Sequence, residues 1–421
     1  VSLAGRLSLR SDSIPEVVLN CQADIQLGDS ITWTARVQND PISAVSLSLT
    51  EGQLHIQDPA ARIRASGRRD NASAEIEVRS GEMVLTPLPG MTDSGFEEIS
   101  MAGAIVQSDL TWDGSQDQKI GQYRFKAEAT KMAVRLGSDR LSMPKVKAAG
   151  SGHLSPSVPE KGSVSAIMEI EQGRFASLER GVSVSGIQVT LPISYPLDPA
   201  AGPGTFMIPA LTVQNRYRFS TRGTLAQTGS RQIEINGQAL LDSLPDMTAE
   251  YRSQIGFANG LAIRADATVR PFTLTQNHLM RLAGEKFRLP GLETADIRAR
   301  VAADATIRVE KGKTRTALVT RIEDGQVSLP ETKLTATGIR TTIRMADLME
   351  VRSLPGQVIT VDSIDINAIR LNDARLSFSV EGKESILVEN LRFKWCNGLV
   401  SSEAVRFPNP EKKYGLTLYC D

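Results

Sequence analysis

Cysteine, aromatic side chains and net charge are all scarce in this chain of 421 residues. It contains 3 cysteines, only 5% of its residues are aromatic, and its 48 Lys and Arg balance its 48 Asp and Glu. A neutral balance provides no general attraction to phosphate backbones, so we expect no nucleic-acid partner. Because 41% of the residues are hydrophobic and 23% are charged, the composition also argues against a disordered tail.

Long hydrophobic runs are missing as well. No stretch approaches the roughly 18 to 20 apolar residues that span a bilayer as a helix. The sequence begins at Val1 without a basic segment followed by an apolar leader. We therefore expect it to be an excerpt of a longer protein, with any membrane anchor outside the excerpt.

The cysteines, Cys21, Cys396 and Cys420, form no CxxC pair and are too far apart for a metal finger. Cys396 and Cys420 either bridge in an oxidising envelope or remain ordinary half-buried thiols. The sequence predicts no metal site and no cofactor.

Alternation of apolar and polar residues is the main positive signal. Tyr123, Phe125 and Ala127 alternate with charged neighbours, which gives a strand one dry face and one wet face. The same pattern recurs in residues 45–49, 211–219, 261–270, 375–380 and 391–395. It predicts an all-β protein, a long, twisted antiparallel sheet curled into a groove, with one or two short helices.

Helical spacing is limited to two places. A helix is expected after Asn277, with Leu279 and Leu282 on one side, ending before Pro290. It is either a short plug or crossover, which we favour, or an amphipathic membrane contact. A second short turn is expected over residues 346–351.

Two segments resemble each other as glycine-marked hairpins. Gly325–Ile339 and Gly173–Ile187 share glycines 13 residues apart and matching apolar positions, and Gly52–Gly67 is a looser copy. Each copy predicts a strand, a glycine-permitted turn or bulge, and a returning strand. Small residues and prolines in 150–160 place a soft boundary near residue 155, dividing the groove into 1–155 and 156–421.

The segments that resemble catalytic motifs each lack a required residue or spacing. Gly312-Lys313-Thr314 lacks the first glycine of a phosphate loop, and Gly181-Val182-Ser183-Val184 lacks the closing glycine of a nucleophile elbow. Asp362 and Asp365 are three residues apart on an alternating strand, so they point to opposite faces. The histidines, His55, His153 and His278, lack ligand spacing. The sequence predicts that the protein is not an enzyme.

A sheet with a dry face and few helices must close on itself, pack against a second sheet or hold something apolar. Small and aliphatic residues on that face suit flexible acyl chains, which need area rather than specific geometry. The main rival is an all-β structural scaffold of the bacterial envelope, in which dry faces cover each other. An enzyme with a pocket assembled from distant segments is a third reading.

The last third of the chain resembles a known family. The runs MADLMEVRSLPGQVITVDSIDINAIRLNDARLSFSV, ILVENLRFKWCNGLVSSEAVRF and YGLTLYCD are similar to the C-terminal region of the YdbH-like family, long labelled "dicarboxylate transport" and related to AsmA-like envelope proteins. The similarity is good from about Ala295 to Asp421 and diffuse before it. Asn367 stands where glycine is expected, and Cys396 stands where a small residue is more usual.

The resemblance implies a periplasmic repeating β-groove protein that is anchored in the inner membrane by a missing segment. It implies a non-enzymatic carrier that moves phospholipid from the inner toward the outer membrane, with proteins in both membranes as partners. The dicarboxylate label fits the residues less well, because a small dianion requires convergent Arg or Lys.

We expect acyl chains to lie along an apolar wall while headgroups stay at the wet edge. Each wall residue has the alternative role of sealing a closed core. The predicted lipid-binding wall consists of Ile339, Ile343, Met345, Leu376, Phe378, Val380, Leu391, Phe393 and Trp395.

Overall fold

The structure is a computed structural model. It describes residues 2–11, 14–26, 31–40, 44–49, 52–68, 71–87, 96–113, 120–154, 162–179, 181–196, 201–229, 232–256, 262–283, 294–310, 313–383, 385–408 and 417–420. The chain divides into two compact units, Val1–Ser230 (unit 1) and Arg231–Asp421 (unit 2).

Unit 1 consists of strands throughout its described residues. They are β1 (Ser2–Ser11), β2 (Ile14–Gln26), β3 (Thr32–Asn39), β4 (Ala44–Leu49), β5 (Gly52–Gln57), β6 (Ala60–Arg68), β7 (Asn71–Pro87), β8 (Phe96–Asp113), β9 (Ile120–Leu136), β10 (Asp139–Leu154), β11 (Ser163–Ser177), β12 (Val182–Tyr195), β13 (Gly204–Val213) and β14 (Tyr217–Gly229).

Unit 2 has strands, one α-helix and one 3-10 turn in its described residues. They are β15 (Gln232–Leu241), β16 (Leu244–Gly256), β17 (Ala262–Thr275), α1 (Gln276–Ala283), β18 (Asp296–Glu310), β19 (Lys313–Leu329), η5 (Pro330–Thr332), β20 (Leu334–Asp347), β21 (Arg352–Ser353), β22 (Gln357–Ile366), β23 (Ile369–Gly382), β24 (Ser385–Trp395), β25 (Gly398–Ser402), β26 (Val405–Phe407) and β27 (Leu418–Cys420).

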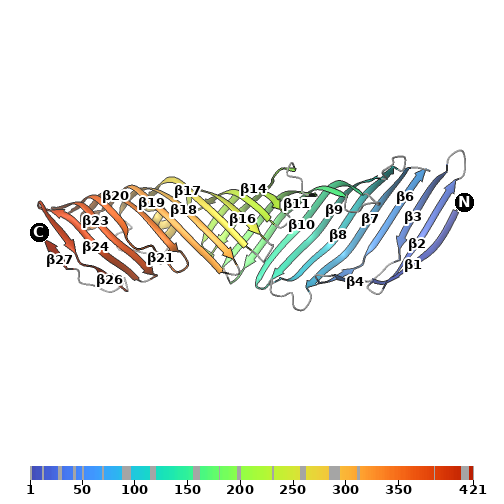
Figure 1. Cartoon of the computed structure of the whole chain (residues 1–421), viewed down its shortest axis with the longest axis horizontal. Helices are drawn as coiled ribbons and strands as arrows, with labels where there is room; N and C mark the ends of the chain where they lie inside the picture. The colour runs from blue at the N-terminus through green and yellow to red at the C-terminus, as the bar shows by residue number, and fades with distance from the viewer. Residues whose placement is uncertain are drawn as a thin grey trace. The chain divides into compact units, whose positions relative to one another are not determined.

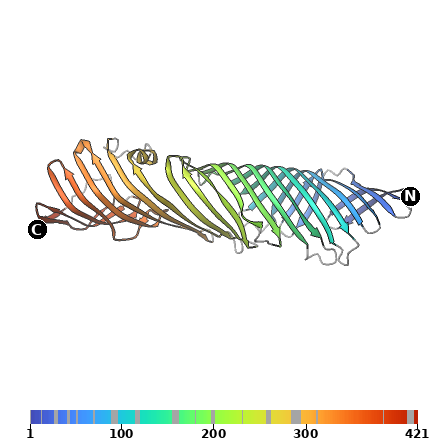
Figure 2. The same ribbon diagram turned by 90° about the horizontal axis from the view of Figure 1, so that it is seen from above.

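Within each unit, successive long strands pair antiparallel with their sequence neighbours. In unit 1, β7 pairs with β8, β8 with β9 and β9 with β10, and in unit 2, β18 pairs with β19 and β19 with β20. Figures 1 and 2 show the strands of each unit slanting and curving, as the intrinsic strand twist requires. The prediction of an all-β, curled antiparallel sheet is confirmed.

The alternating faces follow the sequence pattern. On β9, Tyr123, Phe125 and Ala127 are half-buried, whereas Arg124 and Lys126 between them are exposed. Ser379 departs from the pattern. Alternation predicts it on the wet face of β23, but it is buried, because β21 packs against β23 there and the Val380 amide donates to the Ser353 hydroxyl at 2.8 Å.

A line of backbone irregularities crosses the strands of each unit, and we call it the crease. In unit 1 it contains left-handed residues and prolines at matching heights on β8 to β13: Gly103, Lys131, Pro144, Gln172, Gly186 and Pro209. In unit 2 it contains Pro271, Asp324, Gly338 and Asp373 on β17, β19, β20 and β23. Bulges bend a strand and increase its local twist, so an aligned series bends the whole sheet.

The crease also reverses which positions face the dry side. On β9 the half-buried or buried residues are odd-numbered up to Ala129, whereas beyond the crease the even-numbered Met132 and Val134 are half-buried together with Ala133. On β20 they change from even, with Ala336, to odd, with Ile339 and Ile343. An extra residue shifts the side-chain period by one, so the bend preserves a single dry face.

Both close copies of the glycine-marked hairpin are confirmed, and both begin and end at the crease. Gly173 pairs with Ile187, and Gly325 pairs with Ile339, each between register shifts. A Cβ on either glycine would lie 3.0 or 2.9 Å from the Cβ of its isoleucine partner. Glycine is therefore required at both positions by close cross-strand approach.

The looser copy, Gly52–Gly67, is wrong as a hairpin. Its two strands, β5 and β6, pair antiparallel with successive parts of the same strand, β7, and not with each other. They form one continuous edge that is interrupted near Asp58, whose φ is 45°. Glycine spacing alone does not distinguish a turn from a break within a strand.

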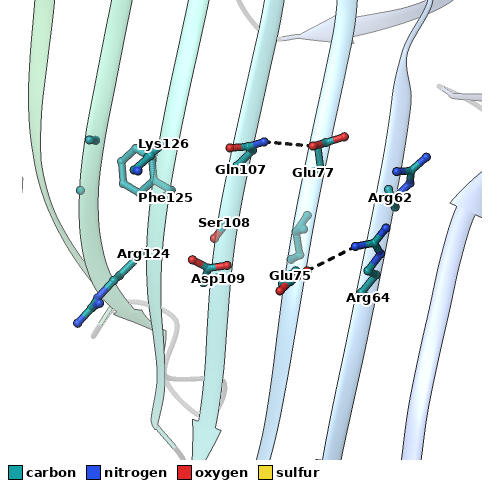
Figure 3. Close-up of a pocket in the computed structure, with 13 residues that line it drawn as sticks. Arg62, Arg64, Glu75, Glu77, Gln107, Ser108, Asp109, Arg124, Phe125 and Lys126 are labelled. Atoms are coloured by element: carbon teal, nitrogen blue, oxygen red, sulfur yellow. Dashed lines mark hydrogen bonds and ion pairs between the residues drawn. The ribbon is translucent and has the colours of Figure 1, made fainter.

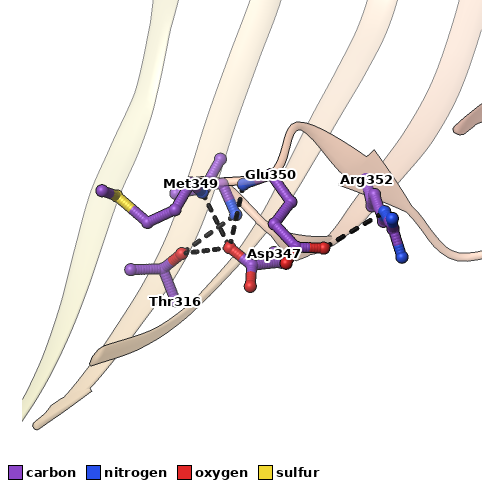
Figure 4. A network of polar contacts seen from close by, with 6 residues as sticks. Thr316, Asp347, Met349, Glu350 and Arg352 are labelled. Carbon is purple, nitrogen blue, oxygen red and sulfur yellow. Dashed lines mark hydrogen bonds and ion pairs between the residues drawn. The ribbon is translucent and has the colours of Figure 1, made fainter. Parts of the chain in front are cut away.

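The helix and the second turn differ from the expectation at their boundaries. The helix α1 begins at Gln276, so Asn277 lies inside it rather than capping it. Pro290, before which the helix is predicted to end, lies outside the described residues. The β20 strand continues to Asp347, and only the following residues turn (Figure 4).

Asp347 organises that turn. Its Oδ1 accepts hydrogen bonds from the backbone amides of Met349 (2.7 Å) and Glu350 (3.3 Å) and from the Thr316 hydroxyl (3.4 Å) (Figure 4). The Leu348 amide donates to the Thr316 hydroxyl at 2.9 Å. These bonds replace ladder partners that the turning backbone lacks.

The expected boundary near residue 155 lies outside the described residues. The strands before and after it, β10 and β11, pair along their length. The pairing begins with Asp139 opposite Ser177 and ends with His153 opposite Ser163. The division at that position stays a prediction.

Candidate functional site

The strand register of unit 2 places the nine predicted wall residues on one face. Ile359 on β22 pairs with Leu376, which pairs with Leu391, and directly paired residues share a face. Thr341 pairs with Ile359, which brings the alternate β20 residues Ile339, Ile343 and Met345 to that face. Phe378 and Val380 follow Leu376 at intervals of two, as Phe393 and Trp395 follow Leu391.

This face is only partly covered by protein. Phe378 is 8% exposed, Trp395 is 42% exposed, and the remaining predicted wall residues are half-buried. Among the described residues, the buried hydrophobic side chains are mostly alanine and valine. An opposing layer would bury the larger side chains first, so this face lacks the partner that a sandwich supplies.

Total surface area agrees with single-layered sheets. The chain exposes 27303 Å², whereas two compact domains sharing its residues would expose roughly 19,000 Å². The excess is what one-layer sheets expose when their apolar face is not packed against another element.

Charged groups occupy the opposite face of unit 2. Arg340 donates a hydrogen bond to Asp362 on that face. Arg375 and Arg392 are neighbours in the strand register of β23 and β24 and share the same face. Ion pairs join Arg370 Nε to Asp365 Oδ1 at 2.7 Å and Lys394 Nζ to Asp373 Oδ2 at 2.8 Å. The nine wall residues are therefore apolar, and the ionisable groups described here lie on the opposite face.

The ion pairs lower the pKa values of the carboxyl groups and raise the pKa of the lysine. The hydrogen bond from Arg370 lowers the pKa of Asp365, and the hydrogen bond from Arg406 lowers the pKa of Glu381. The hydrogen bond to Asp373 raises the pKa of Lys394. These exposed pairs keep the polar face ionised near neutral pH and have the character of a solvated surface rather than of a catalytic centre.

Unit 1 carries a similar wall that sequence reasoning did not assign. Val78 pairs with Val106, Val106 pairs with Ala127, and the row continues through Ala148 and Met168. Val78 and Val106 are 42% and 40% exposed. The alternation around Ala127 was the available signal, but it identified a strand and did not reveal that its dry face is uncovered.

The charged face of unit 1 contains a hollow of about 510 Å³ (Figure 3). Glu77 Oε2 accepts a hydrogen bond from Gln107 Nε2 at 3.1 Å, which lowers its pKa, with Arg79 as a second cause. Arg64 Nη1 lies 4.0 Å from Glu75 Oε2. Opposite charges on adjacent strands compensate each other, so the hollow provides no concentrated charge that would select a small dianion.

No catalytic or metal-binding constellation appears in the described part of the chain. The prediction that Asp362 and Asp365 point to opposite faces is wrong, because the crease crosses β22 at Asp362 and shifts the side-chain period by one. Both lie on the charged face, where Asp362 binds Arg340 and Asp365 binds Arg370. His278 is buried at 9% exposure, with Nδ1 accepting from the Thr275 amide at 3.3 Å and Nε2 3.9 Å from Asp246. The described residues contain no group of three His, Cys, Asp or Glu side chains that could hold a metal ion.

The cysteines are unpaired in the structure. Cys396 and Cys420 are exposed and Cys21 is half-buried, all as free thiols. Cys396 and Asn397 form the turn between β24 and β25 with φ of 49° and 65°. Asn367 has a φ of 54°, so the left-handed turn expected at that position is present without glycine.

Among the described residues, no helix is long and apolar enough to cross a bilayer.

An uncovered apolar face on a curled antiparallel sheet defines the chain as a β-groove protein. The family model described as "YdbH-like: Intermembrane phospholipid transport protein YdbH" matches residues 4–418. The chain belongs to the YdbH-like family, and the match extends far beyond the last third that carries the resemblance. No curated protein sequence matches the chain. The family description names phospholipid transport between membranes, which is not an enzyme class.

Proposed function

We propose that the chain is a non-enzymatic carrier that moves phospholipid between the inner and outer membranes along its apolar walls. Acyl chains lie against the wall of Leu376, Phe378, Leu391 and Phe393 in unit 2 and against the Val78–Val106 row in unit 1. Headgroups stay at the wet edges of the sheets. The remaining predicted residues, Ile339, Ile343, Met345, Val380 and Trp395, extend the unit 2 wall.

The observation that carries this proposal is an apolar face that is neither charged nor covered. Val78, Val106 and Trp395 each keep about two-fifths of their surface exposed although they lie on the dry side. Exposed apolar surface of this kind marks a binding site in a stable protein. The family description supports phospholipid as the cargo.

Movement along such a wall follows from its uniformity. Burial of hydrocarbon is worth about 25 cal/mol per Å², so an acyl chain strongly prefers the wall to water. The wall residues are aliphatic or aromatic and offer no specific polar partner to one position of the chain. A lipid therefore moves between neighbouring positions without breaking hydrogen bonds.

The proposed location is the periplasm, with an anchor in the inner membrane supplied by a segment outside this sequence. Proteins of the inner and outer membranes are the expected partners, because a carrier must load and unload lipid at both surfaces. The cargo and the two-membrane task both follow from the family description.

A matched pair of crosslinking positions tests the proposal. A photo-reactive amino acid replaces Phe393 on the wall or Arg392 beside it on the opposite face. Phospholipid is expected to crosslink at position 393 and not at 392, because successive residues of a strand face opposite sides. Mass spectrometry of the purified chain before and after delipidation measures the total lipid.

Recovery of no phospholipid, with no crosslink at position 393, would reject the carrier. The chain would then be a structural scaffold of the envelope whose dry faces are covered by another protein. Equal crosslinking at positions 392 and 393 would reject the wall while leaving nonspecific lipid association.

A further inference from the structure

Two of the chain's three tryptophans lie in one row at the strand ends of unit 1. Trp33 pairs with Gly67, Gly67 with Ala72, Ala72 with Trp112, and Trp112 with Gly121. Each residue is the second from an end of its strand, on β3, β6, β7, β8 and β9. We call this row the tryptophan rim.

Each ring of the rim lies against a glycine on the neighbouring strand. A Cβ on Gly67 would be 2.7 to 2.8 Å from the Trp33 indole, and a Cβ on Gly121 would be 3.0 Å from the Trp112 ring. A ring that covers a glycine lies along the sheet instead of standing up from it. The indole rings of the rim therefore lie flat on the sheet, and their faces point toward the apolar side.

Tyr123 repeats this arrangement one row further in. A Cβ on Gly152 would be 2.5 Å from the Tyr123 hydroxyl, and that hydroxyl donates to the Ser163 carbonyl at 3.0 Å. Tryptophan and tyrosine concentrate at boundaries between hydrocarbon and water because they have an apolar body and a polar atom.

The opposite rim of unit 1, beyond the crease, has a different composition. Its paired row is wholly apolar and contains Leu85, Ile99, Val134, Leu141, Phe175 and Val184. The two flanks of the sheet therefore differ: both tryptophans of unit 1 lie at the first rim, whereas Tyr217 on β14 is the amphipathic ring near the second.

The depth of the wall matches an acyl chain. On β7, Ala72 at the rim and Val78 on the exposed apolar row are six residues apart, which is about 20 Å at ~3.3 Å per residue. One leaflet of hydrocarbon is about 15 Å thick, half of a ~30 Å core. A lipid with its ester groups at the tryptophans has room for its chains before the crease.

We propose that the tryptophan rim binds the glycerol and ester layer of a diacyl phospholipid and so fixes which rim of unit 1 holds the headgroup. The alternative role of the rings is to stabilise strands that contain glycine. This site rests on the proposed carrier function, so its test separates the two.

Fluorescence quenching by brominated phospholipids provides the test. Trp395→Phe leaves only the rim tryptophans, and the double variant Trp33→Phe/Trp112→Phe leaves only Trp395. Each is loaded with phosphatidylcholine brominated near either the carbonyl or the methyl end of its acyl chains. Bromines near the carbonyl end are expected to quench the rim more strongly, on the order of twofold, because interfacial tryptophans lie at that depth.

Three results overturn the rim site. If Trp395 is quenched but the rim tryptophans are not, lipid binds the chain and the rim is only structural. If methyl-end bromines quench the rim as strongly as carbonyl-end bromines, the orientation is wrong. If neither variant is quenched and no lipid is recovered, the carrier function fails together with the site.

A glycine substitution tests the ring position directly. Gly67→Ala places a methyl group where the Trp33 ring lies and should change the quenching ratio of the rim. Gly5→Ala is the matched control, because a Cβ at Gly5 has no atom within 4 Å. An unchanged ratio in Gly67→Ala, with a normal circular dichroism spectrum, would contradict the flat-ring geometry.

Discussion

The two units use the same backbone device with different side chains on the dry face. In both, a hairpin starts at a crease glycine, Gly173 or Gly325, and returns to a left-handed glycine, Gly186 or Gly338. The cross-strand distances at Gly173 and Gly325 differ by only about a tenth of an ångström. The crease is thus a shared solution for bending a sheet without losing its dry face.

The dry faces themselves are not alike. Between the tryptophan rim and the crease, the unit 1 row through Val106 contains the small residues Ala127 and Ala148, and bulky side chains form the row beyond the crease. The unit 2 wall is built from bulky side chains such as Leu376 and Phe393. The difference shows that bending depends on a few backbone positions, whereas the wall composition varies independently. Under the proposed carrier function, unit 1 would orient a lipid and unit 2 would hold its hydrocarbon.

The largest expected effect comes from placing a charge on either wall. Leu376→Asp in unit 2 or Val106→Asp in unit 1 should lower the phospholipid recovered with the chain about tenfold, because an acyl chain cannot solvate a carboxylate. Arg375→Asp and Lys126→Asp add the same group to the opposite faces and should leave recovery unchanged. Lipid phosphorus per mole of protein measures the result.

If only one of the two wall variants loses bound phospholipid, lipid binding is restricted to the unit that carries that substitution. Equal loss from wall variants and controls would mean that charge acts on folding rather than on cargo, which circular dichroism distinguishes.

The crease glycines should give the next largest effect. Gly186→Ala and Gly338→Ala force a side chain into a left-handed backbone, at φ of 72° and 68°, and each should lower the free energy of unfolding by about 1–3 kcal/mol. The new methyl group would lie 2.7 Å from Pro209 Cγ in the first variant and 2.8 Å from Asp362 Cβ in the second. Neither atom moves away by side-chain rotation alone, so the two variants should lose similar amounts of stability.

Two other glycines serve as controls in denaturant titrations. Gly356→Ala has the left-handed backbone but no neighbour within 4 Å, and Gly256→Ala has neither constraint. A loss at Gly256 equal to that at Gly186 would disprove the special role of the crease.

The smallest effect is expected from acid titration of the polar faces. The folded-state pKa values of Glu171 in unit 1 and of Asp365 and Glu381 in unit 2 are lowered by their partners Lys147, Arg370 and Arg406. Groups of this kind stabilise the fold above their unfolded pKa values of about 4, and this stabilisation is lost as pH falls through the folded values.

Unfolding midpoints should therefore stay level from about pH 7 to 5 and fall below about pH 4. Asp365→Asn should make that fall slightly shallower. Because the group is exposed and screened, a large loss of stability at neutral pH in Asp365→Asn would contradict this account.

The parts of the fold that sequence predicted are those governed by local period. Alternation around Phe125 and Phe378 identified the strands, and the glycine spacing at Gly173 and Gly325 identified the hairpins. The break at Asp58 was missed because a left-handed residue within a line of strand and one in a turn leave the same local pattern. The tryptophan rim was missed because Trp33 and Trp112 are distant in sequence and meet only through Gly67 and Ala72.

By itself, the sequence determined that this chain is a sheet with one wet and one dry face, because a two-residue period is written directly into neighbouring side chains. Only the tertiary structure decided which dry positions share a surface and whether protein covers it. Those properties depend on register, on the extra residues at the crease and on the packing of strands far apart in sequence, and no local pattern contains them.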